Sequence, residues 1–229
     1  MPGKKNKLKM IDLFAGVGGI SCGFRKAGFE VVAANEYDAE IANTYVKNHL
    51  GTKMIVDDIT NVKSADLLGK EKDITVVVGG PPCQGFSMAG RRIRNGGVFL
   101  NDPRNELFKE FIRVVKDVKP KVFVMENVAA ILNIHNGTVK DEIIKKFKNI
   151  GYDTKVCVLL AADYGVPQLR RRAVFIGNRI GVDSEKFFPE KTHGPQKNRS
   201  YVTVAETIFD LPKESAGSGT FESEYSPVK

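Results

Sequence analysis

Two wholly apolar runs in this chain each lead directly into residues that can do chemistry. The first run is the three valines of residues 76–78, from which a Gly-Gly-Pro-Pro turn leads to Cys83. The second run, residues 122–125, ends at Glu126 about forty residues later. An apolar, β-branched run that presents a reactive residue at its carboxyl end is typical of a doubly wound sheet, whose ligands bind outside the carboxyl ends of the strands. We therefore expect a thiol and an acid at one edge of a sheet.

Short apolar runs alternate with helical patterns along most of the chain. This alternation predicts βαβ units, and so a three-layer α/β fold of Rossmann type with a mostly parallel sheet. The order of the strands does not follow from the pattern. We expect strands at residues 9–13, 30–34, 53–56, 74–78, 121–125, 154–160 and 173–176, and helices at 19–27, 39–49, 105–118 and 139–149, the last ended by Gly151.

Composition excludes fewer classes of function than the motifs do. The 229 residues carry a formal charge of +8, which favours a polyanionic partner. No run of 18 or more apolar residues indicates a membrane span, and no signal peptide is visible. The three cysteines form neither a disulfide framework nor a zinc pattern, so we expect a reducing cytoplasm and no metal. Cys22, on a helix, and Cys157, in a strand, are expected to be small buried side chains.

Two stretches interrupt the alternation. Residues 84–103 are rich in glycine and arginine and directly follow Cys83, which favours an active-site lid. Residues 213–229 are rich in Gly, Ser and Glu and are predicted to be a linker or disordered tail. The remaining chain is predicted to be one catalytic domain over residues 8–212, with a cofactor half at 8–75 and a reacting half at 76–180.

The first strand leads into a glycine-rich turn that is typical of a cofactor site. The pattern is G-x-G-G, formed by Gly16, Gly18 and Gly19, with Asp12 four residues before the first glycine. Glycines let the backbone turn tightly and approach a ligand closely. Glu36 ends the second strand, where an acid can accept the hydroxyls of a ribose. An acid beside the loop would repel a pyrophosphate, which favours a phosphate-free, amine-bearing cofactor such as S-adenosylmethionine.

Past the third strand, Asp58 and Ile59 offer an acceptor and an apolar wall to an adenine. Read one at a time, Asp12, the glycines and Asp58 can equally build turns and nothing more. Their order along one βαβ layout favours a cofactor site.

Four segments occur in the order seen in the DNA (cytosine-5)-methyltransferases: residues 12–19, Gly-Pro-Pro-Cys-Gln at 80–84, Glu-Asn-Val at 126–128 and Gln-Leu-Arg-Arg-Arg at 168–172. The chain closely resembles the amino-terminal, catalytic part of that family over about residues 9–180. The resemblance implies a cofactor site for S-adenosylmethionine. Beyond the loop and strand-end residues already named, Phe14, Pro82 and Leu107 are expected to line it.

The resemblance also implies a mechanism in which Cys83 adds to C6 of a flipped cytosine. A cysteine reacts as its thiolate, and nearby amides and arginines lower a thiol pKa. Glu126 would bind N3 and the exocyclic amine, where charge develops. Arg170 and Arg172 match family positions that hold the flipped nucleotide, although three consecutive arginines can also form a solvated turn. DNA contacts are expected from Gln84, Ser87, Arg91, Arg92, Arg94 and Gln168.

Three functional classes remain open at this point. The first is the catalytic part of a DNA methyltransferase of a restriction-modification system, acting on double-stranded DNA. The second is a tRNA cytosine-C5 methyltransferase with the same cysteine and acid. The third is a non-catalytic cofactor- or DNA-binding module. The family's target-recognition region and closing helix are not evident in the sequence. The chain can therefore be one subunit of a split methyltransferase, a truncated enzyme or a decayed remnant, and the first of these predicts a second polypeptide that supplies the missing parts.

Overall fold

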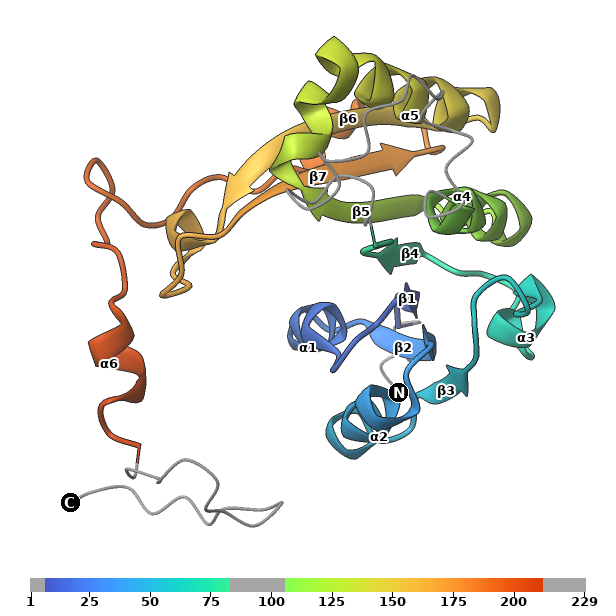
Figure 1. The fold of residues 1–229 in the computed structure, drawn as a ribbon, viewed down its shortest axis with the longest axis horizontal. Helices are drawn as coiled ribbons and strands as arrows, with labels where there is room; N and C mark the ends of the chain where they lie inside the picture. The colour runs from blue at the N-terminus through green and yellow to red at the C-terminus, as the bar shows by residue number, and fades with distance from the viewer. Residues whose placement is uncertain (1–6, 83–105, 212–229) are drawn as a thin grey trace, which may run out of the picture. The chain divides into compact units, whose positions relative to one another are not determined.

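The strands that the structure describes form one seven-stranded sheet. The computed structural model describes residues 7–82 and 106–211, and within them the strand order is β3-β2-β1-β4-β5-β7-β6 (Figure 1). Strands β1 to β5 pair in parallel, whereas β7 is antiparallel to β5, so the predicted mostly parallel α/β sheet is confirmed. The strands are β1 (Lys9–Leu13), β2 (Glu30–Glu36), β3 (Lys53–Val56), β4 (Val76–Gly79), β5 (Val122–Val128), β6 (Asp153–Leu160) and β7 (Arg171–Asn178).

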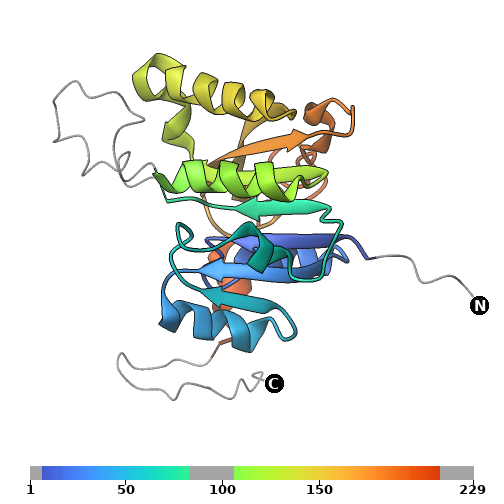
Figure 2. The same ribbon diagram turned by 90° about the vertical axis from the view of Figure 1, so that its right-hand side faces the viewer.

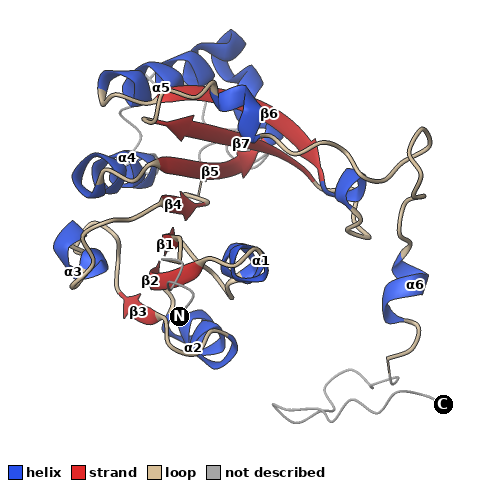
Figure 3. Cartoon of the chain, turned by 180° about the vertical axis from the view of Figure 1, so that it is seen from behind, coloured by secondary structure: helices blue, strands red, loops and turns tan. Residues whose placement is uncertain are grey.

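Helices cover both faces of this sheet (Figures 2 and 3). The two earliest, α1 (Gly19–Lys26) and α2 (Ala39–Asn48), lie on one face, and α3 (Ser64–Leu68), α4 (Glu106–Val118) and α5 (Thr138–Asn149) lie on the other. The four predicted helices are present with ends that agree within a residue or two. Helix α3 was not predicted, because five residues are too few to show a helical period. Gly151 follows α5 with φ +89°, which confirms its capping role.

The apolar residues of β1 alternate between the two faces. Ile11 and Leu13 join a cluster that includes Phe111 of α4 and Phe123 of β5. Met10 instead joins a smaller cluster beneath α1. Successive side chains of a strand point to opposite faces, so the apolar residues of β1 contribute to both cores. This arrangement holds β1 rigidly in the middle of the sheet.

The chain reverses its direction of travel across the sheet between β1 and β4. Strands β2 and β3 are added on one side of β1, and β4 and β5 on the other. In such sheets the ligand crevice lies at this switch point, outside the carboxyl ends of the strands. Leu13 and Gly79 pair there, and a Cβ on Gly79 would lie 2.6 Å from the Leu13 carbonyl oxygen. The close approach of the two strand ends therefore requires a glycine at position 79.

The chain divides into two compact units, Met1–Val158 with Arg172–Phe188 and Leu159–Arg171 with Pro189–Lys229. The second unit has its own polar centre. Its buried Asp163 carboxylate binds Lys191 Nζ at 2.9 Å and accepts a hydrogen bond from the Tyr201 hydroxyl at 3.0 Å. These partners hold the pKa of Asp163 below its usual value, the Lys191 hydrogen bond contributing most. This unit also holds the short helix α6 (Val204–Ile208). The predicted single domain over residues 8–212 remains a prediction.

The expectation for two of the cysteines is wrong. Cys22 and Cys157 are free and exposed, not buried. The side of α1 that packs inward at this point presents Ser21, which turns Cys22 outward. Cys157 lies on the exposed side of β6, the last strand of the sheet. A separate finding is that none of the helices in residues 7–82 and 106–211 has the length and hydropathy needed to cross a membrane.

Candidate active site

The glycine-rich turn after β1 is held against the end of β2. The Gly16 amide donates to Glu36 Oε2 at 2.8 Å, and the Ala15 amide donates to the Asn35 carbonyl at 2.9 Å. The second carboxylate oxygen of Glu36 accepts a hydrogen bond from the Asp38 amide at 3.1 Å. Glu36 is only half-buried. The acid predicted to bind a ribose thus also fixes the loop, while its carboxylate stays at the carboxyl edge of the sheet.

Gly18 is required by space as well as by backbone conformation. Its φ is +92°, and a Cβ at this position would lie 2.1 Å from Nε2 of the buried His49 ring. Gly16 has φ +57° but open space around its Cβ position, so only its backbone conformation favours glycine. The His49 ring therefore packs directly against the glycine-rich loop at Gly18. Burial lowers the pKa of His49, which favours the neutral ring.

Asp12 lies beneath the loop and not on its surface. Its side chain is fully buried in β1 and accepts a hydrogen bond from the Ser21 hydroxyl at 2.6 Å. The Ser21 hydroxyl is in turn 2.7 Å from the Tyr45 hydroxyl. Burial raises the pKa of Asp12 to about 7. Asp12 does not line the cavity described next, so its carboxylate is not the group that would repel a pyrophosphate.

A cavity of about 440 Å³ opens at the switch point beside the glycine loop. Its walls come from the carboxyl ends of the central strands and the start of α4. The cavity is lined by Phe14, Asn35, Glu36, Tyr37, Asp58, Ile59, Gly80, Pro82 and Leu107. The structure therefore brings together six residues that were assigned to the cofactor site: Phe14, Glu36, Asp58, Ile59, Pro82 and Leu107. Asp12, Gly16, Gly18 and Gly19, which were also assigned to the cofactor, are not part of the lining.

The chemistry of this lining fits a nucleoside that carries no phosphate. Glu36 and Asp58 are both acidic, and none of the lining residues that the structure describes is a lysine or an arginine. Such a wall repels a pyrophosphate and favours hydroxyl, amine and sulfonium groups. Phe14, Ile59 and Leu107 supply apolar surface for a base. The residues present therefore fit S-adenosylmethionine, with Glu36 placed to accept ribose hydroxyls and Asp58 to accept from an amino group.

Three lining residues, Asn35, Tyr37 and Gly80, were not among the predicted site residues, and the first two flank Glu36. Asn35 is buried and donates to the carbonyls of Ile55 at 3.1 Å and Asp57 at 2.9 Å, which ties the end of β2 to the end of β3. Tyr37 is 73% exposed beside Glu36. Both flank Glu36 directly. The sequence signal that could have identified them is their position next to an acid at the end of a strand.

Glu126 stands beside the turn that leads out of β4. Its Oε2 would be 3.1 Å from a Cβ on Gly80, the same glycine that lines the cavity. The neighbouring Asn127 is buried and donates from Nδ2 to the Pro81 carbonyl at 3.2 Å. Residues of β5 thus hold both the acid and the Gly-Pro-Pro turn in place. Gly80 therefore lies next to both the acid and the cavity.

Arg172 pairs with Glu126, with 2.6 Å between Nε and Oε1. Strand pairing explains the contact, because Glu126 lies opposite Val174 and Val128 lies opposite Arg172. Arg172 is therefore a diagonal neighbour of Glu126 on the same face of the sheet. The two side chains are 27% and 31% exposed, so the pair is only partly shielded from water. The arginine orients the carboxylate that it binds.

The other predicted site residues are not placed with this pair. Arg170 and Gln168 are exposed and belong to the second compact unit, in the turn before β7. Cys83, the nucleophile, and the predicted DNA contacts Gln84, Ser87, Arg91, Arg92 and Arg94 lie outside the described residues, as does the predicted lid. The distance between Cys83 and Glu126 remains a prediction. Among the residues that the structure describes, no group of His, Cys, Asp and Glu could hold a metal ion.

Comparison with known proteins identifies the family to which this chain belongs. The family model described as C-5 cytosine-specific DNA methylase matches residues 8–226. The chain belongs to this family. The family resemblance seen in the motifs is thereby confirmed, and with it the expected cofactor, S-adenosylmethionine.

Individual C-5 methylases and their structures agree. Type II methyltransferase M1.HphI of Haemophilus parahaemolyticus is 45% identical over 215 residues, which are 93% of this chain and 55% of that protein. M.AquIA of Picosynechococcus is 39% identical, and the match covers 89% of each chain. A crystal structure of a putative DNA modification methyltransferase encoded within a prophage (E. coli) matches with a TM-score of 0.72 and 31% identity, covering 91% of this chain and 56% of that one.

Other comparisons extend only to the fold or to part of a protein. A Spodoptera frugiperda DNMT2 variant matches with a TM-score of 0.63 at 22% identity, covering 91% of this chain and 61% of that one, which shows a shared fold alone. The chain spans about half the length of the first curated C-5 methylases that it matches.

Proposed function

We propose that the chain is the catalytic part of a DNA cytosine-C5 methyltransferase, using Cys83 as nucleophile and Glu126 as acid. The observation that carries this proposal is the position of Glu126. Its carboxylate is paired with Arg172 and lies next to Gly80. Gly80 also lines the cavity of about 440 Å³ at the switch point, which is called the nucleoside cavity below. A base held by Glu126 would lie next to a methyl donor held in that cavity.

In this mechanism the Cys83 thiolate adds to C6 of a cytosine that has left the duplex. The electron pair of the C5–C6 double bond shifts toward C5, while Glu126 binds N3 and the exocyclic amine and stabilises the charge that develops there. S-adenosylmethionine, which Glu36, Asp58 and Leu107 would hold in the cavity, would supply the electrophilic methyl group that C5 takes up. Loss of the C5 proton then expels the Cys83 thiolate and restores the ring. Arg172 keeps Glu126 turned toward the base throughout.

A duplex that contains 5-fluorocytosine tests the nucleophile, because fluorine at C5 cannot leave as a proton and the adduct through sulfur persists. With S-adenosylmethionine and any partner polypeptide present, we expect a covalent complex that survives denaturation, and none for Cys83→Ser. The variant Cys22→Ser/Cys157→Ser removes the two exposed thiols and should leave trapping intact. Trapping on tRNA in place of DNA would favour the RNA-modifying alternative. An absence of any adduct with either nucleic acid, or an adduct that survives Cys83→Ser, would refute the mechanism.

The part played by a second polypeptide belongs to the same proposal. We infer that sequence recognition comes from outside residues 8–212, so DNA binding by this chain alone is mainly electrostatic and nearly independent of sequence. Robust, sequence-specific methylation by the purified 229-residue chain would refute this inference. A cytoplasmic location is also proposed, supported by two free, exposed cysteines that suit a reducing compartment.

A further inference from the structure

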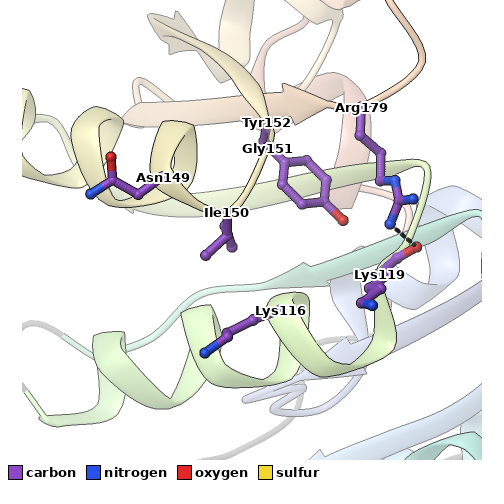
Figure 4. A pocket seen from close by; sticks show the side chains of 7 residues that line it. All are labelled: Lys116, Lys119, Asn149, Ile150, Gly151, Tyr152 and Arg179. Atoms are coloured by element: carbon purple, nitrogen blue, oxygen red, sulfur yellow. Dashed lines mark hydrogen bonds between the residues drawn. The ribbon is translucent and has the colours of Figure 1, made fainter.

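A second cavity, of about 540 Å³, lies at the opposite edge of the sheet from Glu126. It is lined by Lys116, Lys119, Asn149, Ile150, Gly151, Tyr152 and Arg179 (Figure 4). Lys119 precedes β5, whereas Glu126 is near the carboxyl end of that strand. The two sites therefore lie at opposite ends of β5. The proposed reaction makes no use of this second cavity.

The lining is positively charged and its cations come from different elements. Lys116 is in the last turn of α4, Lys119 follows that helix, and Arg179 follows β7. Arg179 donates from Nη1 to the Lys119 carbonyl at 3.5 Å, as the dashed line in Figure 4 shows. In the described part of the chain, no carboxylate forms a salt bridge with any of these three side chains. Their charges are therefore available to a ligand.

The acidic groups nearest in sequence are directed to other partners. Asp117 accepts a hydrogen bond from Ser64 at 2.8 Å and lies 3.9 Å from Arg113. Asp153 accepts a hydrogen bond from the Ser184 amide at 3.0 Å. Tyr152 donates its hydroxyl to the Pro120 carbonyl at 2.7 Å, and burial raises its pKa to about 12, so it adds no negative charge.

Helix dipoles explain only part of this charge. The carboxyl ends of α4 and α5 face the cavity, and each carries roughly −0.5 elementary charge that a lysine would complement. Two such ends offset about one of the three unit charges. Arg179 is not on a helix, so the dipoles do not account for it. The cavity keeps a net positive charge, and its volume is in the range of small-molecule sites.

We propose that this cavity binds the phosphate of a nucleotide, either a free nucleotide or one unit of a nucleic-acid strand. Arginine and lysine are the side chains that bind phosphate oxygens best, the arginine through its fork of N–H donors. Asn149 adds an amide donor, and Ile150 offers apolar surface beside it. The site contrasts with the cavity at the carboxyl edge, whose charged lining residues in the described part of the chain are Glu36 and Asp58, so the two cavities favour opposite ligands.

Amide shifts of the ¹⁵N-labelled 229-residue chain test this assignment, because they report each cavity separately. The probes are adenosine, adenosine monophosphate, inorganic phosphate and a short single-stranded DNA. The monophosphate should shift the amides of Gly151 and Tyr152, and adenosine, which lacks the phosphate, should not. Shifts caused by inorganic phosphate as well would identify a free anion as sufficient. Shifts caused only by the monophosphate and the DNA would identify a nucleotide unit.

A charge-matched pair of variants completes the test. Lys116→Gln/Lys119→Gln should weaken monophosphate binding at this site by about tenfold or more, since each lost charge-assisted hydrogen bond costs a large share of that factor. Lys26→Gln/Lys63→Gln removes the same charge from exposed lysines elsewhere and should leave the affinity unchanged. Equal weakening in both variants, or no shift of Gly151 and Tyr152 with any phosphate-bearing probe, would overturn the proposal.

Discussion

Asp12 gives the fold a pH dependence that a single substitution should remove. Its carboxyl group is fully buried, and burial raises its pKa from 3.8 to about 7. Ser21 and Glu36 also act on it, Ser21 lowering the pKa through its hydrogen bond and Glu36 raising it through its charge. Between these two pKa values the folded chain holds a proton that the unfolded chain has released. The stabilisation is therefore fully present below about pH 4 and is lost as the pH rises through about 7.

The magnitude follows from the size of the shift. Each pKa unit corresponds to about 1.36 kcal/mol, so the full shift is worth about 4 kcal/mol. Between about pH 5 and about pH 8 the free energy of unfolding should fall by about 3 kcal/mol from this group alone. Asp12→Asn keeps the shape of the side chain and cannot titrate. Its absolute stability also depends on how the new amide is hydrogen-bonded, so the difference between the two pH values is the quantity to compare.

Urea unfolding of both proteins at the two pH values provides the measurement. The free energy of unfolding of the unmodified chain, minus that of Asp12→Asn, should drop by about 3 kcal/mol on going from about pH 5 to about pH 8. Titrating groups that do not interact with Asp12 are present in both proteins and cancel in this difference. Parallel stability profiles for the two proteins across this range would refute the assignment of a raised pKa to Asp12.

Three further substitutions address the loop, the cavity and the acid. Gly18→Ala should lower the free energy of unfolding by about 2 kcal/mol or more in a urea titration, because the added Cβ would lie 2.1 Å from His49 and the backbone φ is +92°. Gly23→Ala is the control, because a Cβ there would meet nothing within 4 Å, and equal stability of the two variants would contradict this prediction. Glu36→Gln should weaken S-adenosylmethionine about tenfold in calorimetry, and an unchanged affinity would remove Glu36 from the site. Arg172→Gln should slow adduct formation with 5-fluorocytosine DNA about tenfold or more, and the affinity for S-adenosylmethionine should change little. An unchanged rate would show that the ion pair between Arg172 and Glu126, at 2.6 Å, has no part in the reaction.

The sequence predicted the strands well because their apolar runs are local signals. The seven expected strands are present, and six of the ten residues assigned to the cofactor line one cavity. Long-range placement was not predictable in the same way. The sequence placed Asp12 beside the loop, and only the structure shows that Ser21 and the packing of α1 bury it. The pairing of Glu126 with Arg172 depends on the register of β5 against β7, which no local pattern encodes.

Asn35, Tyr37 and the exposed cysteines illustrate the same distinction. Asn35 lines the cavity because its amide bridges two strand ends, and that role requires knowing which strands are neighbours. The burial of Cys22 was inferred from residue type, although the side of the helix that faces the core depends on how α1 packs. Chemistry was predictable where a motif follows its strand directly. Chemistry was not predictable where residues from two different elements must come together.

Gly80 is the position where the cofactor half and the reacting half of the site share a wall. It lines the nucleoside cavity on one side, and on the other a Cβ would lie 3.1 Å from Glu126 Oε2. Gly80→Ala should therefore push the carboxylate by a few tenths of an ångström without closing the cavity. Misplacing a reacting group by about 1 Å costs about a hundredfold in rate, so we expect a loss of roughly tenfold.

The measurement compares the rate of adduct formation with the affinity for S-adenosylmethionine. The rate should fall in Gly80→Ala and the affinity should change little, because the substituent points at the acid and not at the ribose. Gly23→Ala, whose Cβ would meet nothing within 4 Å, should change neither. A variant that loses cofactor affinity and keeps its rate at saturating cofactor would show that Gly80 shapes the cavity alone. The acid would then be positioned by Arg172 and Asn127, independently of the turn that carries the nucleophile.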